Sequence, residues 1–167
     1  MRMAFLIGVI LSGAFRAAPS PPDPCTVLKQ ADIQALAGSA KVGAAVATTL
    51  PAGMGASCRY IWGAGASAAA GRWSLDINIG EASKLYPGMG LATLKEGFAM
   101  QTKPDPSNAS LVPGVGEAAV YTSATPLQVN MTAYVKGLIL QIGLEGPTAR
   151  MKKDQAIALL KTAAGRM

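Results

Sequence analysis

The chain has 167 residues, of which 50% are hydrophobic and 14% are charged. This balance is typical of one folded domain with an apolar core, and it excludes a disordered chain of low hydrophobicity and high charge. The sequence contains no histidine, so the most common general base and the most common metal ligand are both missing. We therefore expect one globular domain without a cofactor or a metal site.

The N-terminus has the pattern of an export signal. Arg2 precedes an apolar run from Ala4 to Leu11, and small residues follow at Ser12 and Ala14. The run is shorter than the roughly 20 apolar residues that a membrane-spanning helix needs. We expect residues 1–18 to be a signal peptide rather than a permanent anchor.

Cleavage of this signal near residues 14–18 would leave a short leader and one domain. The leader, residues 19–24, is rich in proline, and the remaining 25–167 form a single expected domain. The expected location is periplasmic or secreted, with no transmembrane anchor after cleavage.

Cys25 and Cys58 are the two cysteines of the chain. In an oxidising compartment an even pair most simply forms one disulfide. A metal site is the rival interpretation, but such sites need four ligands and this chain has no histidine to supply them. We expect a structural disulfide that stabilises the fold by about 3–4 kcal/mol in the chain-entropy model.

Helix and strand patterns alternate in the first part of the domain. A helix is predicted over 26–37, where apolar residues recur on one face before a glycine, and a β-favouring run follows over 42–50. Strands are predicted over 57–62 and 72–79 because every second residue is apolar. The spacing of apolar residues predicts a further helix over 90–102.

The last third of the chain has the pattern of a β-meander closed by a helix. Strands are predicted over 118–123, 128–135 and 138–142, with Lys136-Gly137 as a two-residue turn between the last two. A terminal helix is predicted from about residue 148. The whole pattern predicts an α+β domain of two layers, a mostly antiparallel sheet with helices packed on one face.

A glycine-rich segment, VPGVGEAAVY, begins at Val112 and contains a G-x-G-x-x-A spacing. A dinucleotide-binding loop needs a strand before it, a helix after it and an acidic residue about 20 positions further on. Here Pro113 interrupts any preceding strand, strand-favouring residues follow, and no acidic residue lies between Glu117 and Glu145. We interpret the segment as a turn between strands.

Three motifs support a resemblance. They are Pro24-Cys25 before a short helix, Cys58-x-Tyr60-x-Trp62 on a strand, and the segment Val112–Ala119 entering a strand before an Ala-rich, basic terminal helix. This order resembles the small exported domains of unknown function in proteobacterial periplasmic proteins and actinobacterial lipoproteins. The resemblance implies helices packed on an antiparallel sheet, and it implies no established activity and no catalytic residue. The lipid-anchoring cysteine of the lipoprotein members is missing here.

The candidate binding surface is the polar face of the predicted sheet. Its expected side chains are Arg72, Ser74, Asp76 and Asn78 on one strand, and Gln128, Asn130, Thr132 and Tyr134 on another. Such a face could receive a sugar polymer, a peptide or a partner protein. The alternative is an ordinary solvated face, which every two-layer domain of this kind has.

Two further interpretations stay open. The C-terminal segment is basic, through Arg150, Lys152, Lys153, Lys161 and Arg166, and could bind polyanions. It has no aromatic residues, so we do not expect nucleic-acid binding. A hydrolase would need two facing carboxylates, for which Asp76 with Glu117 or Glu145 are candidates.

The leading expectation is an exported, non-catalytic domain that binds an envelope component or a protein partner. The sequence does not decide its oligomeric state.

Overall fold

The computed structural model describes residues 20–167, which form a seven-stranded antiparallel sheet of order β1-β2-β3-β7-β6-β5-β4. The expected signal peptide over 1–18 lies outside the described residues. The strands are β1 (Val46–Thr49), β2 (Ala56–Trp62), β3 (Trp73–Glu81), β4 (Ala109–Leu111), β5 (Ala118–Thr125), β6 (Gln128–Val135) and β7 (Leu138–Glu145). The helices are α1 (Pro24–Val27), α2 (Gln30–Ala37), α3 (Ala82–Leu85), α4 (Leu91–Thr102) and α5 (Lys153–Gly165), with short 3-10 turns at Pro51–Gly53 and Ala149–Lys152.

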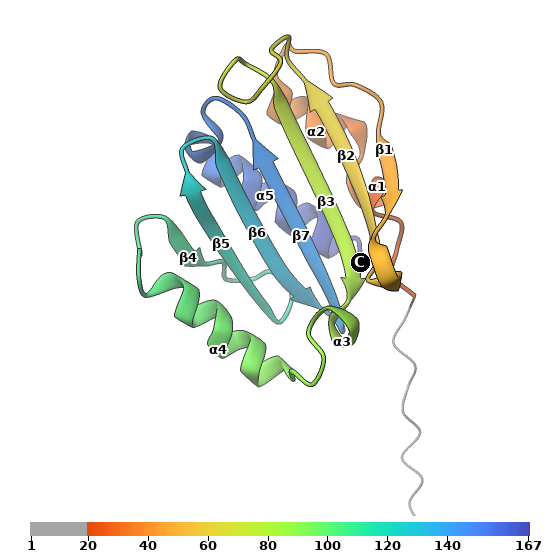
Figure 1. Cartoon of the computed structure of the whole chain (residues 1–167), viewed down its shortest axis with the longest axis vertical. Coiled ribbons are helices and arrows are strands. Elements are labelled where there is room, and N and C mark those ends of the chain that lie inside the picture. The colour runs from red at the N-terminus through yellow and green to blue at the C-terminus, as the bar shows by residue number, and fades with distance from the viewer. Residues whose placement is uncertain (1–19) are drawn as a thin grey trace, which may run out of the picture.

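One face of the sheet is buried under helices. Figure 1 shows the sheet face-on, with α1, α2 and α5 behind it. Every second residue along the central strands faces these helices, and Ile77 of β3, Leu140 of β7 and Met131 of β6 are fully buried there together with Leu160 of α5. The alternation seen in the sequence therefore produces a single large core, and the predicted α+β class with an antiparallel sheet is confirmed.

The helices do not all pack on one face as predicted, because α3 and α4 cover one end of the opposite face. Ala82 of α3 and Leu94 of α4 pack against Ile139 of β7, with Tyr134 of β6 at the edge of this smaller cluster. Helix α4 lies along β4 and β5, at the lower left of the sheet in Figure 1. The middle of this face, over β2, β3, β7 and β6, carries no helix.

The single helix predicted over 26–37 is wrong, because the chain forms two helices there. Helix α1 ends before Leu28, whose backbone is extended, and α2 starts again at Gln30. Polar side chains explain the break: the Asp32 carboxylate accepts a hydrogen bond from the Lys29 backbone N–H at 2.7 Å, which caps α2. The spacing of apolar residues alone does not show that one helix ends and another begins, because α1 and α2 both bury apolar residues in the same core.

The disulfide between Cys25 and Cys58 is present, with the two Cα atoms 5.1 Å apart. It joins α1 to the second strand of the sheet, and Cys58 is fully buried in the core. The bond therefore holds the N-terminal helices against the buried face of the sheet.

The C-terminus is also tied to the N-terminal helices. Arg166 donates from Nη1 to a carboxylate oxygen of Asp32 at 2.6 Å and to the Val27 carbonyl at 3.0 Å. The hydrogen bond from Arg166 is the main reason that the pKa of Asp32 lies below its ordinary value of 3.8.

This contact gives an expected pH dependence. Because the folded pKa of Asp32 is lowered, its stabilising effect is present above pH 3.8 and is lost as the pH falls through the lowered value. We expect Asp32→Asn to be less stable than the parent chain to urea at neutral pH, and this difference should shrink under strongly acidic conditions. Glu96→Gln, on the exposed side of α4, serves as the control. A difference between parent and Asp32→Asn that stays constant with pH would contradict the assignment.

Candidate functional site

The register of the sheet places polar side chains in rows on the open face. Opposite residues of an antiparallel pair project to the same side, so one row can be followed across neighbouring strands. Arg59 of β2 lies opposite Asp76 of β3, which lies opposite Gly143 of β7, which lies opposite Asn130 of β6. Residues far apart in the sequence thus form one continuous line.

A second row runs beside the first and is built of uncharged hydrogen-bonding groups. Its members, from β2 to β6, are Ser57, Asn78, Gln141 and Thr132. Gln128 of β6 and Glu145 of β7 lie opposite each other, two residues along from Asn130 and Gly143 of the first row. Together with this pair, the two rows line a hollow of about 460 Å³. The hollow lies over the part of the sheet that no helix covers.

Gly143 gives the hollow its depth. A Cβ atom built at this glycine would lie 3.4 Å from Oδ1 of Asn130 and 3.9 Å from Cβ of Asp76. These are near-normal contacts, so a methyl group would fit but would fill the space between the two side chains. The missing side chain therefore opens the centre of the face.

The charged groups of the hollow are partly balanced. Arg59 donates from Nε to a carboxylate oxygen of Asp76 at 2.6 Å, and the exposed fractions of the two side chains are 57% and 26%. This hydrogen bond, followed by the charges of Asp76 and Glu145, raises the pKa of the Arg59 guanidinium. The arginine thus stays protonated and reachable from solvent beside two carboxylates.

Most of the side chains that the sequence placed on this face do line the hollow. They are Asp76, Asn78, Gln128, Asn130 and Thr132. The other three do not: Arg72 precedes β3 and is exposed, Ser74 is buried in the sheet, and Tyr134 packs against the smaller apolar cluster.

Sequence reasoning missed the contributions of β2 and β7. Gln141 and Gly143 come from β7, which lies between the two strands whose polar residues were predicted. Ser57 and Arg59 come from β2. Alternation along both strands was visible in the sequence, but the order of strands in the sheet was not.

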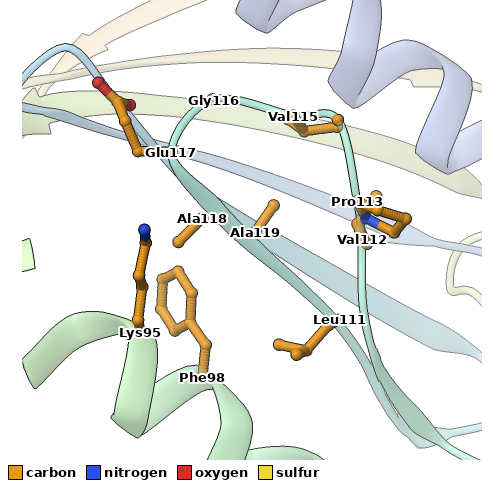
Figure 2. Close-up of a pocket in the computed structure, with 11 residues that line it drawn as sticks. Lys95, Phe98, Leu111, Val112, Pro113, Val115, Gly116, Glu117, Ala118 and Ala119 are labelled. Carbon is orange, nitrogen blue, oxygen red and sulfur yellow. The ribbon is translucent and has the colours of Figure 1, made fainter. Parts of the chain in front are cut away.

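The glycine-rich segment forms a second, more apolar hollow of about 300 Å³. In Figure 2, Phe98 and Lys95 rise from α4 on one side, Leu111 projects from β4, and the loop arches over them. The Val112 N–H donates to the Ala119 carbonyl at 2.9 Å, so the loop joins two paired strands. The interpretation as a turn is confirmed, because a strand and not a helix follows it.

Glu117 at the end of this loop has a structural partner. Both of its carboxylate oxygens accept the backbone N–H of Lys136 at 3.1 Å, in the turn between β6 and β7. Glu117 therefore holds a turn and lies outside the polar hollow on the open face, whereas Asp76 and Glu145 both line that hollow. Of the two carboxylate pairs considered from the sequence, the structure therefore brings Asp76 and Glu145 to the same hollow, and not Asp76 and Glu117.

The basic C-terminal residues largely contact the rest of the fold. The Lys152 ammonium donates to the Leu36 carbonyl at 2.9 Å, and the Lys153 ammonium lies 4.6 Å from the centroid of the Tyr121 ring. Arg150 donates from Nε to a serine hydroxyl of β5 at 3.1 Å. These contacts attach the start of the terminal helix and the turn before it to α2 and β5, and they occupy charges that a polyanion would need.

The chain matches no protein-family model, no curated protein and no solved structure. Within residues 20–167, no helix has the length and apolar character needed to cross a membrane. The same residues contain no cluster of three or more acidic or cysteine side chains suited to a metal ion. The resemblance to small exported bacterial domains therefore stays a prediction.

Proposed function

We propose that this chain is an exported, non-catalytic domain that binds a saccharide polymer of the bacterial envelope through the hollow on the open face of its sheet. The observation that carries the proposal is the composition of this hollow. Its polar side chains are hydroxyls, carboxamides, two carboxylates and one guanidinium, arranged in rows around Gly143, with the apolar Leu50 also lining the hollow.

The chemistry of these groups favours a ligand rich in hydroxyls. Carboxamides and carboxylates both offer two polar atoms in one plane, and carboxamides can donate and accept at once. A saccharide presents neighbouring hydroxyls that also donate and accept. Many of these hydroxyls can therefore form hydrogen bonds with the side chains of the hollow, although the saccharide carries no charge. Asn130, Gln141 and Asn78 are spread over adjacent strands, which suits an extended chain lying across the sheet.

Other ligand classes fit this hollow less well. A lipid tail needs apolar surface, whereas the side chains that form the two rows are polar. The centre of a protein interface is typically aromatic and depleted in charge. No aromatic side chain of the described residues lines this hollow, and the charged residues Arg59, Asp76 and Glu145 do line it.

Export is supported by the disulfide. Such bonds persist in oxidising compartments and are rare in the cytosol. The bond between Cys25 and Cys58 agrees with the export signal expected over residues 1–18. The resemblance to exported bacterial domains points to the same compartment.

A carboxylate hydrolase is less well supported. Asp76 and Glu145 lie on adjacent strands of one open face, not on opposite walls of a cleft, and Asp76 already pairs with Arg59. Glycoside hydrolysis needs an acid and a base that face each other across the bond to be cleaved. Binding without cleavage therefore fits the arrangement better.

The substitution Gly143→Ala tests the proposal. It fills the centre of the hollow while its new methyl group makes near-normal contacts, so the fold should be kept. We expect binding of soluble oligosaccharides prepared from bacterial envelope polymers, measured by titration calorimetry, to weaken roughly tenfold, or about 1.4 kcal/mol.

Gly97→Ala is the matched control for this experiment. It adds the same methyl group on α4, where no atom lies within 4 Å of the new carbon. Both alanine variants should be as stable as the parent chain or slightly more stable, because alanine restricts the unfolded chain more than glycine does. Equal affinity of parent, Gly143→Ala and Gly97→Ala would contradict binding in the hollow.

A further inference from the structure

The sheet has one edge whose backbone is free among the described residues. Strand β1 pairs with β2 on one side, and no described residue hydrogen-bonds to its other side. All four residues of β1 are exposed, Val46 to 57%. In Figure 1 this strand forms the right-hand margin of the sheet.

The register shows which backbone groups point outward. The Leu50 N–H donates to the Gly55 carbonyl at 2.9 Å and closes the connection to β2. Since hydrogen-bonding direction alternates along an antiparallel strand, Val46 and Thr48 direct their backbone groups toward β2. Ala47 and Thr49 then direct their N–H and C=O groups away from the sheet.

The two edges of the sheet differ in how they are protected. The opposite edge, β4, has only three residues, and α4 packs along it. Natural proteins usually protect exposed edges with charges, prolines, bulges or covering elements. The sequence of 42–50, VGAAVATTL, contains no charged residue and no proline. Helix α1 contacts β1, but no described residue hydrogen-bonds to the outward backbone groups of this strand.

We propose that β1 pairs antiparallel with β1 of a second copy of this chain. A two-fold symmetric contact requires a surface that complements itself. Small uncharged side chains meet this condition, because alanine, valine and threonine place no like charges opposite each other. The outward N–H and C=O groups of Ala47 and Thr49 supply matching donors and acceptors on both copies.

Such a dimer has a definite geometry. Two-fold antiparallel pairing brings residues with side chains on the same face opposite each other, so the open faces of both copies lie on one side of a continuous sheet. The two hollows then face the same way, which suits a repeating polymer and adds avidity without new contacts. This last step rests on the proposed saccharide binding, whereas the dimer itself does not.

Ala47→Pro tests the pairing. Proline removes an outward N–H and leaves the hydrogen bonds between β1 and β2 in place, which edge strands tolerate. By sedimentation equilibrium over increasing concentrations of the mature chain, we expect the parent to form a dimer. The variant should dissociate with a constant at least roughly tenfold higher, because the symmetric contact loses the hydrogen bond at both copies.

Thr48→Lys provides a second variant in case proline disturbs the strand. It places two ammonium groups across the same junction, and it should also weaken the dimer while its circular dichroism matches the parent. Ala66→Lys, in an exposed loop, is the matched control and should dimerise normally. A parent chain that stays monomeric at millimolar concentration, or folded edge variants that dimerise like the parent, would overturn the proposal. A monomer that still binds saccharide would leave the proposed function intact.

Discussion

Replacing Cys25 and Cys58 together by alanine is expected to lower the free energy of unfolding by about 3–4 kcal/mol. The bond spans a sequence separation of 33 residues, and its loss lets the unfolded chain explore many more conformations. Since domains of this size are stable by only about 5–15 kcal/mol, the change should be visible as a large shift of the urea midpoint.

Reduction of the parent chain provides the control for this experiment. The reduced parent should approach the stability of the double variant, and reductant should not affect the variant itself. A loss below about 1 kcal/mol would mean that the N-terminal helices hold their place on the sheet without the bond.

Gly116→Ala is expected to lower the free energy of unfolding by about 3 kcal/mol, from backbone strain and overpacking together. Gly116 has φ of +51°, and a Cβ atom there would lie 2.2 Å from the Tyr134 carbonyl oxygen. The backbone of β6 cannot easily move aside, because it pairs with strands on both sides.

Gly114 in the same loop offers a matched comparison. It has φ of +73°, but no atom lies within 4 Å of a Cβ built there. Gly114→Ala should therefore show only the conformational cost of a positive φ, about 1 kcal/mol. Urea unfolding of both variants measures the difference. Equal losses would show that the close approach to β6 is not what requires glycine at position 116.

The strands could be predicted wherever apolar and polar residues alternate without interruption. Strand β6 has the predicted bounds, and β3 lies within one or two residues of its prediction. Strand β7 continues to Glu145, three residues beyond the predicted end. Gly143 lies on the polar face of β7 but has no polar side chain, so the alternation of apolar and polar residues is interrupted there and the predicted strand stops at residue 142.

The candidate site was only partly visible in the sequence for a different reason. Alternation assigns a side chain to a face of its own strand, but it does not say which strands are neighbours. Asp76 and Asn130 were both placed on the polar face, yet Gly143 between them follows only from the strand order. The contribution of Arg59 follows in the same way from the pairing of β2 with β3.

The measurement that tests the proposed function most directly is an NMR titration of the isotope-labelled chain with soluble envelope oligosaccharides. We expect the largest backbone amide shifts at Asp76, Asn130, Gln141 and Gly143, with little change in α5 or in the loop over 112–117. Shifts confined to α5 would instead support polyanion binding by the basic helix. The absence of any saturable shift on the open face would contradict saccharide binding in the hollow.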